Sequence, residues 1–298
     1  MTPEQLRIFV AVAERGHVTR AAGLLGMSQS AASAAIKALE TGSGVQLFNR
    51  VGRAIELSPA GRRFLPEAKA VLERIAEARH VLENASQTIA GSIAIAASQT
   101  IASYWLPRRL AAFQDNHPAV RLDVSIGNTR QVENRVLDGT ADMGLVEGRT
   151  ESDILRRTSV EVDHLMLVVA KTHPEVAELS PGQPDVSSLR WIVREAGSGT
   201  REVLQDLARR MAIPFDSLSI FLVLPSNEAI VQAVEAGAGA TIISELVVGR
   251  AVAEGSVRHV PLTLPARDFA VISHRDRQPT LSQTALRSFL LTGTNPRG

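Results

Sequence analysis

Hydrophobic and polar positions in the first half of the N-terminal region follow helical spacing. Apolar residues recur every three or four positions after Thr2-Pro3, again over 18–25, and again after Ser28. This spacing, with a polar cap residue or proline at the start of a segment, predicts three amphipathic helices. A turn at Gly26 separates the second helix from the third. The pattern therefore predicts a compact helix-turn-helix module.

The next segment predicts a β-hairpin and then a long helix. Two short strands are expected on either side of Val51-Gly52, and Ser58-Pro59 supplies a cap and a first-turn proline for the helix. Apolar residues on this helix fall mostly at steps of three and four, which is the spacing of a coiled-coil seam. They are Leu65, Ala68, Leu72, Ile75 and Leu82. We expect two copies of the chain to dimerise along this seam; packing on its own domain is the alternative.

From about residue 91 onward, short apolar strands alternate with amphipathic helices. This alternation predicts an α/β fold of two subdomains joined by two crossover strands, near 161–162 and 265–268. A ligand cleft is expected between the halves, at the carboxyl ends of the strands. The expected domains are a winged helix-turn-helix at 1–58, a linker helix at 59–90 and an effector-binding domain at 91–298. Within the effector-binding domain, subdomain I is expected at about 91–161 and 267–298, and subdomain II at about 162–266.

Charge is distributed unevenly along the chain. The net charge is only +1, but residues 1–90 carry 11 Lys and Arg against 8 Asp and Glu. Between Arg20 and Arg63 there are six basic residues and two acidic ones. A basic patch on an otherwise balanced protein is typical of a phosphate-binding face, although a plain solvated surface is the alternative.

Small polar residues at the start of the third helix suit the major groove, because they let the backbone approach the base edges. We expect two arginines of the wing to contact DNA phosphates or the minor groove. The residues expected to contact DNA are Thr19, Arg20, Ser28, Gln29, Ser30, Ser33, Lys37, Arg50 and Arg53.

These motifs resemble the DNA-binding domain of LysR-type transcriptional regulators. The resemblance is carried by Gln5-Leu6-Arg7-Ile8-Phe9, Thr19-Arg20-Ala21-Ala22, the segments 28–33 and 47–50, and Leu57-Ser58-Pro59-Ala60-Gly61. It implies promoter DNA with two-fold related half-sites, a dimer of dimers, contact with RNA polymerase and an effector domain with periplasmic-binding-protein architecture. Two positions depart from the family: Ala34 replaces a basic or amide residue, and Ser30 stands where proline is frequent. Ala34 removes one expected DNA contact.

Several strand-to-helix junctions of the larger domain are rich in hydroxyl, amide and glycine residues. Backbone N–H groups at helix N-termini, with nearby hydroxyls and arginines, form an anion site, whereas each junction alone is an ordinary helix cap. The residues expected to bind the effector are Ser98, Gln99, Thr100, Asn128, Thr129, Glu147, Arg194, Ser198, Gly199, Thr200, Arg201 and Asn227.

The amino-acid sequences of these junctions are similar to those of one branch of the family, the regulators of carbon fixation and of sulfur or sulfite metabolism. The matching segments are 128–129, 144–148, 194–201 and 226–229. This resemblance implies a small anionic effector. A sulfur oxyanion such as sulfite or sulfate is favoured, and a phosphorylated metabolite comes next.

Other classes of protein are disfavoured by what the chain lacks. It has no cysteine, which excludes disulfides, cysteine-ligated zinc and a cysteine nucleophile. No two histidines stand at metal-ligand spacing, and no Gly-x-Ser-x-Gly motif occurs. We expect no enzyme activity, metal, other cofactor or membrane span, and a cytoplasmic location. The alternatives are an intracellular solute-binding or sensor protein, and a metabolic enzyme with an appended DNA-binding domain.

Overall fold

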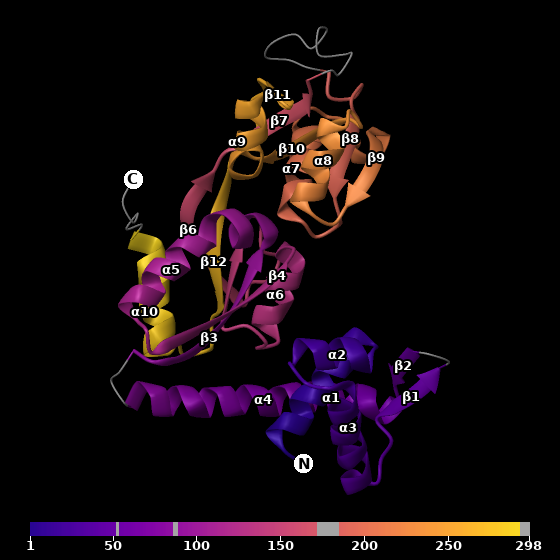
Figure 1. The fold of residues 1–298 in the computed structure, drawn as a ribbon, viewed down its shortest axis with the longest axis vertical. Helices are drawn as coiled ribbons and strands as arrows, with labels where there is room; N and C mark the ends of the chain where they lie inside the picture. Colours follow the sequence, from indigo (N-terminus) through magenta and orange to yellow (C-terminus); the bar gives the residue numbers. More distant parts are fainter. Residues whose placement is uncertain (52–53, 86–88, 172–184, 293–298) are drawn as a thin grey trace. The chain divides into compact units, whose positions relative to one another are not determined.

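The computed structural model describes residues 1–51, 54–85, 89–171 and 185–292. It divides into two units, Met1–Ser86 and Gln87–Gly298, each of which is described by itself. Figure 1 shows a mainly helical first unit and a second unit built on two sheets. Each unit buries its own hydrophobic cores.

The N-terminal unit is a winged helix-turn-helix followed by a long helix. Thr2 and Gln5 form a capping box at the first helix, and Gly16 ends that helix in a left-handed conformation. Phe9 packs in the core with ring centroids 5.3 Å from Phe48 and 5.1 Å from Phe64. The elements are α1 (Pro3–Arg15), α2 (Val18–Leu24), α3 (Gln29–Ser43), β1 (Phe48–Val51), β2 (Ala54–Leu57) and α4 (Pro59–Ala85).

Two side chains fasten the wing to the helices. The Glu40 carboxylate on α3 accepts the backbone N–H of Leu47 at 2.7 Å. Ser58 caps α4 by accepting the N–H of Gly61 at 3.0 Å, and its hydroxyl donates to the carbonyl of Gln46 at 2.7 Å. The two junctions of the wing are therefore tied to the helices before and after it.

Subdomain I of the second unit contains a five-stranded sheet in the order β4-β3-β5-β12-β6. The strands β4, β3 and β5 are parallel, so their carboxyl ends share one edge. The strands are β3 (Gly91–Ser98), β4 (Val120–Gly127), β5 (Met143–Val146), β6 (Leu155–Asp163) and β12 (Arg267–His274). The helices are a π-helical turn η1 (Ile101–Trp105), α5 (Leu106–Asn116), α6 (Thr129–Leu137) and α10 (Leu281–Thr292).

Subdomain II contains a second five-stranded sheet in the order β11-β7-β10-β8-β9, in which β10, β8 and β9 are parallel. The strands are β7 (Leu165–Ala170), β8 (Arg190–Arg194), β9 (Ser219–Leu224), β10 (Ala240–Ser244) and β11 (Val257–Val260). The helices are α7 (Gly199–Arg210), the 3₁₀ turn η3 (Phe215–Ser217), α8 (Asn227–Glu235) and α9 (Glu245–Glu254).

Two long strands connect the subdomains. β6 and β12 pair antiparallel, with Leu155 opposite His274 at one end and Asp163 opposite Arg267 at the other. They are neighbouring strands of the sheet of subdomain I and extend from it toward subdomain II (Figure 1). This arrangement confirms the predicted α/β fold with two crossover strands.

The structure also differs from the sequence-based prediction in several elements. The first crossover strand covers Leu155–Asp163, although the pattern indicated only 161–162. The helix α9 and the strand β11 were not predicted, and Ile101–Trp105 forms a π-helical turn where an ordinary helix was expected. No helix among the described residues is long and apolar enough to cross a bilayer.

Candidate functional site

The residues predicted to contact DNA lie on α2, at the cap of α3 and along α3. All those that the structure describes are exposed except Ser33, which is half-buried. Ser28 accepts the N–H of Ala31 at 3.2 Å, and its hydroxyl lies 3.0 Å from that of Ser30. Gln29, Thr19, Arg20 and Lys37 are likewise exposed. The start of α3 is therefore a polar surface with basic side chains near it.

The structure describes only part of the wing that carries the two predicted arginines. Arg50 belongs to β1, but its side chain lies outside the described part, as does the whole of Arg53. Two further arginines, Arg62 and Arg63, are exposed at the start of α4. Arg62 donates to the carbonyl of Leu57 at 2.7 Å.

The predicted effector residues lie between the two subdomains, at the carboxyl ends of parallel strands. Ser98 ends β3, Asn128 follows β4 and Glu147 follows β5, whereas Arg194 ends β8. Asn227 begins α8, which follows β9. Hydrogen bonds across the cleft connect the residues of the two subdomains.

A cluster of four side chains spans the cleft: Arg194, Glu195, Gln99 and Asn227. Arg194 is 4% exposed. One terminal nitrogen donates to Oε1 of Gln99 at 2.7 Å and to Oδ1 of Asn227 at 2.9 Å. Its Nε and its other terminal nitrogen donate to the two oxygens of Glu195 at 2.8 and 3.0 Å. The guanidinium is thus directed at protein acceptors from both subdomains.

Asn227 and Gln99 extend this network. The side-chain amide of Asn227 donates to Oγ1 of Thr100 at 3.0 Å, and its backbone N–H donates to Oε1 of Gln99 at 2.9 Å. Thr100 and Asn227 are both fully buried. Arg201 also joins this region, because it donates to the carbonyl of Arg194 at 3.1 Å.

Three helices present their N-termini in this part of the domain. Asn128 caps α6 in a capping box with Gln131, and Ser226 caps α8. Ser198 caps α7 through the N–H of Thr200 at 3.3 Å. Helix N-termini favour negative charge, because their first N–H groups have no partner within the helix.

Three buried side-chain oxygens have no hydrogen-bond partner within the part of the chain that is described. They are Oγ of Ser98, Oγ1 of Thr129 and Oε2 of Glu147. All three belong to predicted effector residues, and the three residues are 2–4% exposed. Buried polar atoms are almost always paired in native proteins. These three atoms are therefore candidate contacts for a polar ligand.

Glycines bring the two subdomains close together beside these oxygens. A Cβ on Gly148 would lie 3.1 Å from Oγ1 of Thr129 and 3.2 Å from Cα of Gly199. A Cβ on Gly199 would lie 2.9 Å from the backbone nitrogen of Gly148. The absence of side chains at Gly148 and Gly199 thus permits this close approach of backbone to backbone.

Sequence reasoning missed Glu195, Glu228 and Tyr104 as site residues. Glu228 accepts the Gln99 amide at 2.8 Å and the Tyr104 hydroxyl at 3.0 Å across the cleft. Burial, and then the Glu228 charge, raises the pKa of Tyr104 to about 12. The segments 194–201 and 226–229 contain both glutamates, but nothing in their spacing indicates that the carboxylates bond across the subdomains.

A cavity of about 380 Å³ borders the crossover strands, and Glu147, Gly148 and Gly199 of the site are among the residues that line it. Arg157 and Asp268 line it as a bidentate pair at 3.1 and 2.9 Å. Glu202 also lines it, and burial raises the pKa of this carboxyl. The cavity is strongly charged, with acidic and basic groups in balance.

Comparison with known families assigns both units. "Bacterial regulatory helix-turn-helix protein, lysR family" matches residues 3–62, and "LysR substrate binding domain" matches residues 86–294. The Escherichia coli (strain K12) protein named "Uncharacterized HTH-type transcriptional regulator YeiE" is 35% identical over 291 residues, which cover 97% of this chain and 96% of that protein.

Two further relatives belong to the expected branch. A "Probable RuBisCO transcriptional regulator" of Trieres chinensis is 34% identical, covering 82% of this chain and 80% of its own. The "HTH-type transcriptional regulator CysL" of Bacillus subtilis (strain 168) is 33% identical, covering 81% and 80%. The branch resemblance is confirmed by these two names.

Solved structures show the same fold. Full-length CbnR complexed with its target DNA is 22% identical, with a TM-score of 0.64, covering 97% of this chain and 99% of that chain. The regulatory domain of Synechocystis PCC6803 CcmR in complex with 2-PG is 24% identical, with a TM-score of 0.62, covering 69% and 98%. The chain belongs to the LysR family of DNA-binding transcriptional regulators, with an effector-binding domain, and is not an enzyme.

Proposed function

We propose that this regulator responds to a small anion bound between the two subdomains of its effector domain. The proposal rests on three buried side-chain oxygens, on Ser98, Thr129 and Glu147. None of them has a hydrogen-bond partner among the described residues. A ligand that pairs with these atoms removes the cost of burying them unpaired, which is about 1–3 kcal/mol for each.

Helix N-termini in the cleft offer compensation for a negative charge. Thr129 and Gly199 begin α6 and α7, and a Cβ on Gly199 would lie 3.2 Å from the unpartnered oxygen of Thr129. Each helix N-terminus acts as roughly half a positive charge. Hydroxyls at Ser98 and Thr129 donate hydrogen bonds to an oxyanion. The remaining residues of the predicted set position these groups.

Glu147 supports a choice among the sulfur oxyanions. An ionised carboxylate accepts hydrogen bonds and donates none. Hydrogensulfite carries a proton that can be donated to Oε2 of Glu147, whereas sulfate at neutral pH carries none. We therefore favour sulfite over sulfate. A phosphorylated metabolite is second, because the relatives include RuBisCO regulators and the CcmR domain is in complex with 2-PG.

For DNA, we propose that α3 enters the major groove, with Gln29, Ser30, Ser33 and Lys37 nearest the bases. Thr19, Arg20 and Ser28 would approach the flanking phosphates. The exposed start of α3 and the structural likeness to CbnR in complex with its target DNA support this placement. Arg50 and Arg53 remain our candidates for contacts from the wing.

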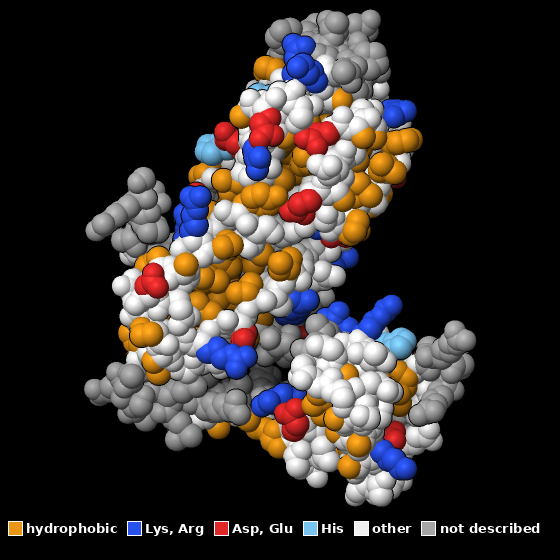
Figure 2. All heavy atoms as spheres, viewed as in Figure 1, with side chains coloured by type: hydrophobic (Ala, Val, Ile, Leu, Met, Phe, Trp, Pro, Cys, Tyr) orange, Lys and Arg blue, Asp and Glu red, His pale blue; other side chains and the backbone are white. Residues whose placement is uncertain are grey.

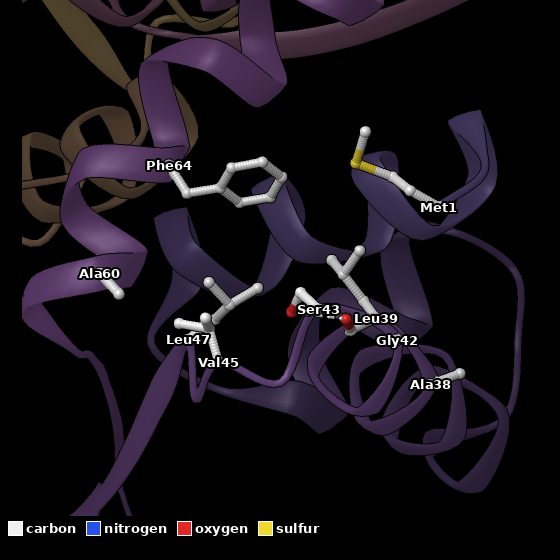
Figure 3. Close-up of a pocket in the computed structure, with 9 residues that line it drawn as sticks. All are labelled: Met1, Ala38, Leu39, Gly42, Ser43, Val45, Leu47, Ala60 and Phe64. Atoms are coloured by element: carbon white, nitrogen blue, oxygen red, sulfur yellow. Dashed lines mark hydrogen bonds between the residues drawn. The ribbon is translucent and has the colours of Figure 1, made fainter.

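We also propose a dimer of dimers, with two-fold related half-sites on the operator. Val71 on α4 is 41% exposed. Beside the first turns of α4 lies an apolar hollow of about 250 Å³, into which Phe64, Leu47 and Val45 project (Figure 3). A linker helix of a second copy would cover these groups, because exposed apolar patches mark interaction surfaces.

The effector domain carries further apolar surface for assembly. Hydrophobic side chains gather over the edge strand β9, where Phe221 and Val223 are 49% and 52% exposed (Figure 2). The edge strand β4 of the other sheet exposes Val124 and Ile126 at 43% and 55%. The family resemblance further implies contact with RNA polymerase and a cytoplasmic location, both of which stay predictions.

Isothermal titration calorimetry on the full-length chain tests the effector proposal. Sulfite, sulfate, thiosulfate, phosphate and 2-phosphoglycolate would be titrated into the wild type and into Thr129→Val. We expect one of these anions to bind and Thr129→Val to weaken it at least tenfold, since a charge-assisted hydrogen bond contributes about 1.5–3 kcal/mol.

Thr140→Val is the matched control, because Thr140 is exposed and its hydroxyl already pairs with Asp138. Glu147→Gln supplies a donor at the same place, so it should narrow the difference between sulfite and sulfate. If none of the five anions binds the wild type, the anion proposal is wrong.

A further inference from the structure

Glu195 occupies an unusual place in the cleft. Its carboxylate forms a bidentate pair with its chain neighbour Arg194 and also accepts the side-chain amide of Asn128 from the other subdomain at 3.0 Å. Burial alone would raise the pKa of Glu195, but hydrogen bonds from Arg194 and Asn128 outweigh it and lower the pKa. The group is therefore an anion at neutral pH, and it holds donors that an effector would otherwise use.

The charge balance of the cleft depends on this pair. Arg194 is 4% exposed, so little solvent screens its interaction with Glu195. With Arg194 neutralised, the positive potential left for an effector comes from Arg201, which donates to the backbone carbonyl of Arg194, and from the N-termini of α6 and α7, about half a charge each. Glu147 lies beside them with an unpartnered oxygen and opposes that potential. Such a site suits a single negative charge better than two.

We propose that Glu195 determines the charge selectivity of the effector site: as a resident counter-ion of Arg194, it makes the cleft accept monoanions in preference to dianions. This inference rests on the proposed function, because it concerns an anion in the same cleft. The residue needs no contact with the effector itself. It acts through Arg194 and is a positioning and charge-setting residue.

Glu195→Gln keeps the shape and removes the charge. Because Coulomb energy scales with the product of the charges, freeing Arg194 should favour a dianion twice as much as a monoanion in free energy. A gain of about threefold in affinity for a monoanion then corresponds to about tenfold for a dianion. Calorimetry on the full-length chain at low salt, with methanesulfonate as the fixed monoanion and sulfate as the fixed dianion, measures this ratio. Sulfite is titrated in parallel.

Glu254→Gln is the matched control. Glu254 also pairs with an arginine, Arg250, at 2.7 Å, but on the exposed surface of α9 and away from the cleft residues. We expect Glu254→Gln to leave the sulfate-to-methanesulfonate ratio within about twofold of the wild type, since solvent screens exposed charges. A melting temperature close to that of the wild type shows that Glu195→Gln is folded.

The outcomes separate the two proposals. A rise in the sulfate-to-methanesulfonate ratio in Glu195→Gln alone supports the inference. If the wild type binds sulfite and Glu195→Gln weakens all anions alike, Glu195 merely orients Arg194; the charge-selectivity proposal then fails and the effector proposal stands. If the wild type binds none of the anions, both fail.

Discussion

Asp163 on β6 and Arg267 on β12 form a buried ion pair where the two crossover strands enter subdomain II. Their side chains are 1% and 5% exposed, and Nε of Arg267 donates to Asp163 at 2.7 Å. Ser244 also donates to Asp163, and Arg267 donates to the hydroxyl of Thr200 at 3.3 Å. The pair thus connects the crossover strands to β10 and to the N-terminus of α7.

Arg267→Met should lower the free energy of unfolding by about 3 kcal/mol, because it leaves Asp163 buried without a counter-charge. Adding Asp163→Leu should restore much of that loss, since no buried charge then remains unpaired. Both tryptophans, Trp105 and Trp191, belong to the effector domain, so their fluorescence in urea reports its unfolding. A double variant no more stable than Arg267→Met would contradict this account.

The Arg157–Asp268 pair should make stability depend on acid pH. Hydrogen bonds from Arg157 hold the pKa of Asp268 below its usual value, despite partial burial. A lowered pKa in the folded state means that the stabilisation is present above the unfolded value of about 3.9 and is lost as pH falls through the folded pKa. The pair is partly exposed, so we expect less than about 1 kcal/mol.

Urea unfolding of the wild type and of Asp268→Asn at pH 7 and at pH 3 measures this contribution. The difference between the two proteins should be positive at pH 7 and should shrink at pH 3. A difference that stays constant with pH would show that the charge of Asp268 plays no part.

The sequence predicted best where the pattern is local. Thr2, Ser28 and Asn128 each precede a periodic apolar segment, and each caps a helix in the structure. The long helix begins at Pro59 with Ser58 as its cap, as predicted. Caps and periodicity act within a few residues, so one sequence contains the necessary information.

The sequence predicted poorly those strands and side-chain contacts that depend on residues far away along the chain. The sequence of Leu155–Asp163 is mostly polar, because five of its nine side chains are exposed to solvent. Its strand conformation comes from pairing with β12, more than a hundred residues later. The partners of Glu195 and Glu228 depend likewise on how the two subdomains meet. Periodicity shows which face is buried, but not which carboxylate will meet which donor.

Gly61 offers a test of the N-terminal unit. A Cβ on Gly61 would overlap the backbone carbonyl oxygen of Leu47, which cannot move away as a side chain would. Gly61→Ala should therefore destabilise this unit by about 1–3 kcal/mol or more. Gly42→Ala is the control: Gly42 lies in α3 with nothing within 4 Å of the added atom, and alanine there should be neutral or stabilising by up to about 1 kcal/mol.

Circular dichroism at 222 nm measures helix loss in the whole chain, whereas tryptophan fluorescence follows only the effector domain. Gly61→Ala should lower the temperature of a helical transition and leave the fluorescence transition in place. Equal stability of Gly61→Ala and wild type would mean that α4 does not pack on the wing as described.

Lys37 on α3 tests the DNA-binding surface. If it contacts a phosphate, Lys37→Gln should weaken binding to all operator sequences and reduce the slope of log K against log salt by about 1 for each DNA-binding domain on the operator. Fluorescence anisotropy with a promoter fragment at several salt concentrations measures the slope. Lys171→Gln makes the same change on an exposed position of the effector domain and should leave the slope unaltered; an unaltered slope for Lys37→Gln would remove it from the interface.

Thr129 and Thr100 should respond in opposite ways to the same substitution, even without effector. The Thr129 hydroxyl is buried with no partner among the described residues, whereas the Thr100 hydroxyl accepts the Asn227 amide at 3.0 Å. Valine has the shape of threonine without the hydroxyl. Thr129→Val should therefore leave the ligand-free protein equally or more stable, whereas Thr100→Val should cost about 1–3 kcal/mol by leaving the Asn227 donor unpaired. Tryptophan-detected urea unfolding of both variants gives the comparison, and a destabilised ligand-free Thr129→Val would mean that its hydroxyl already has a partner in solution and is not reserved for an effector.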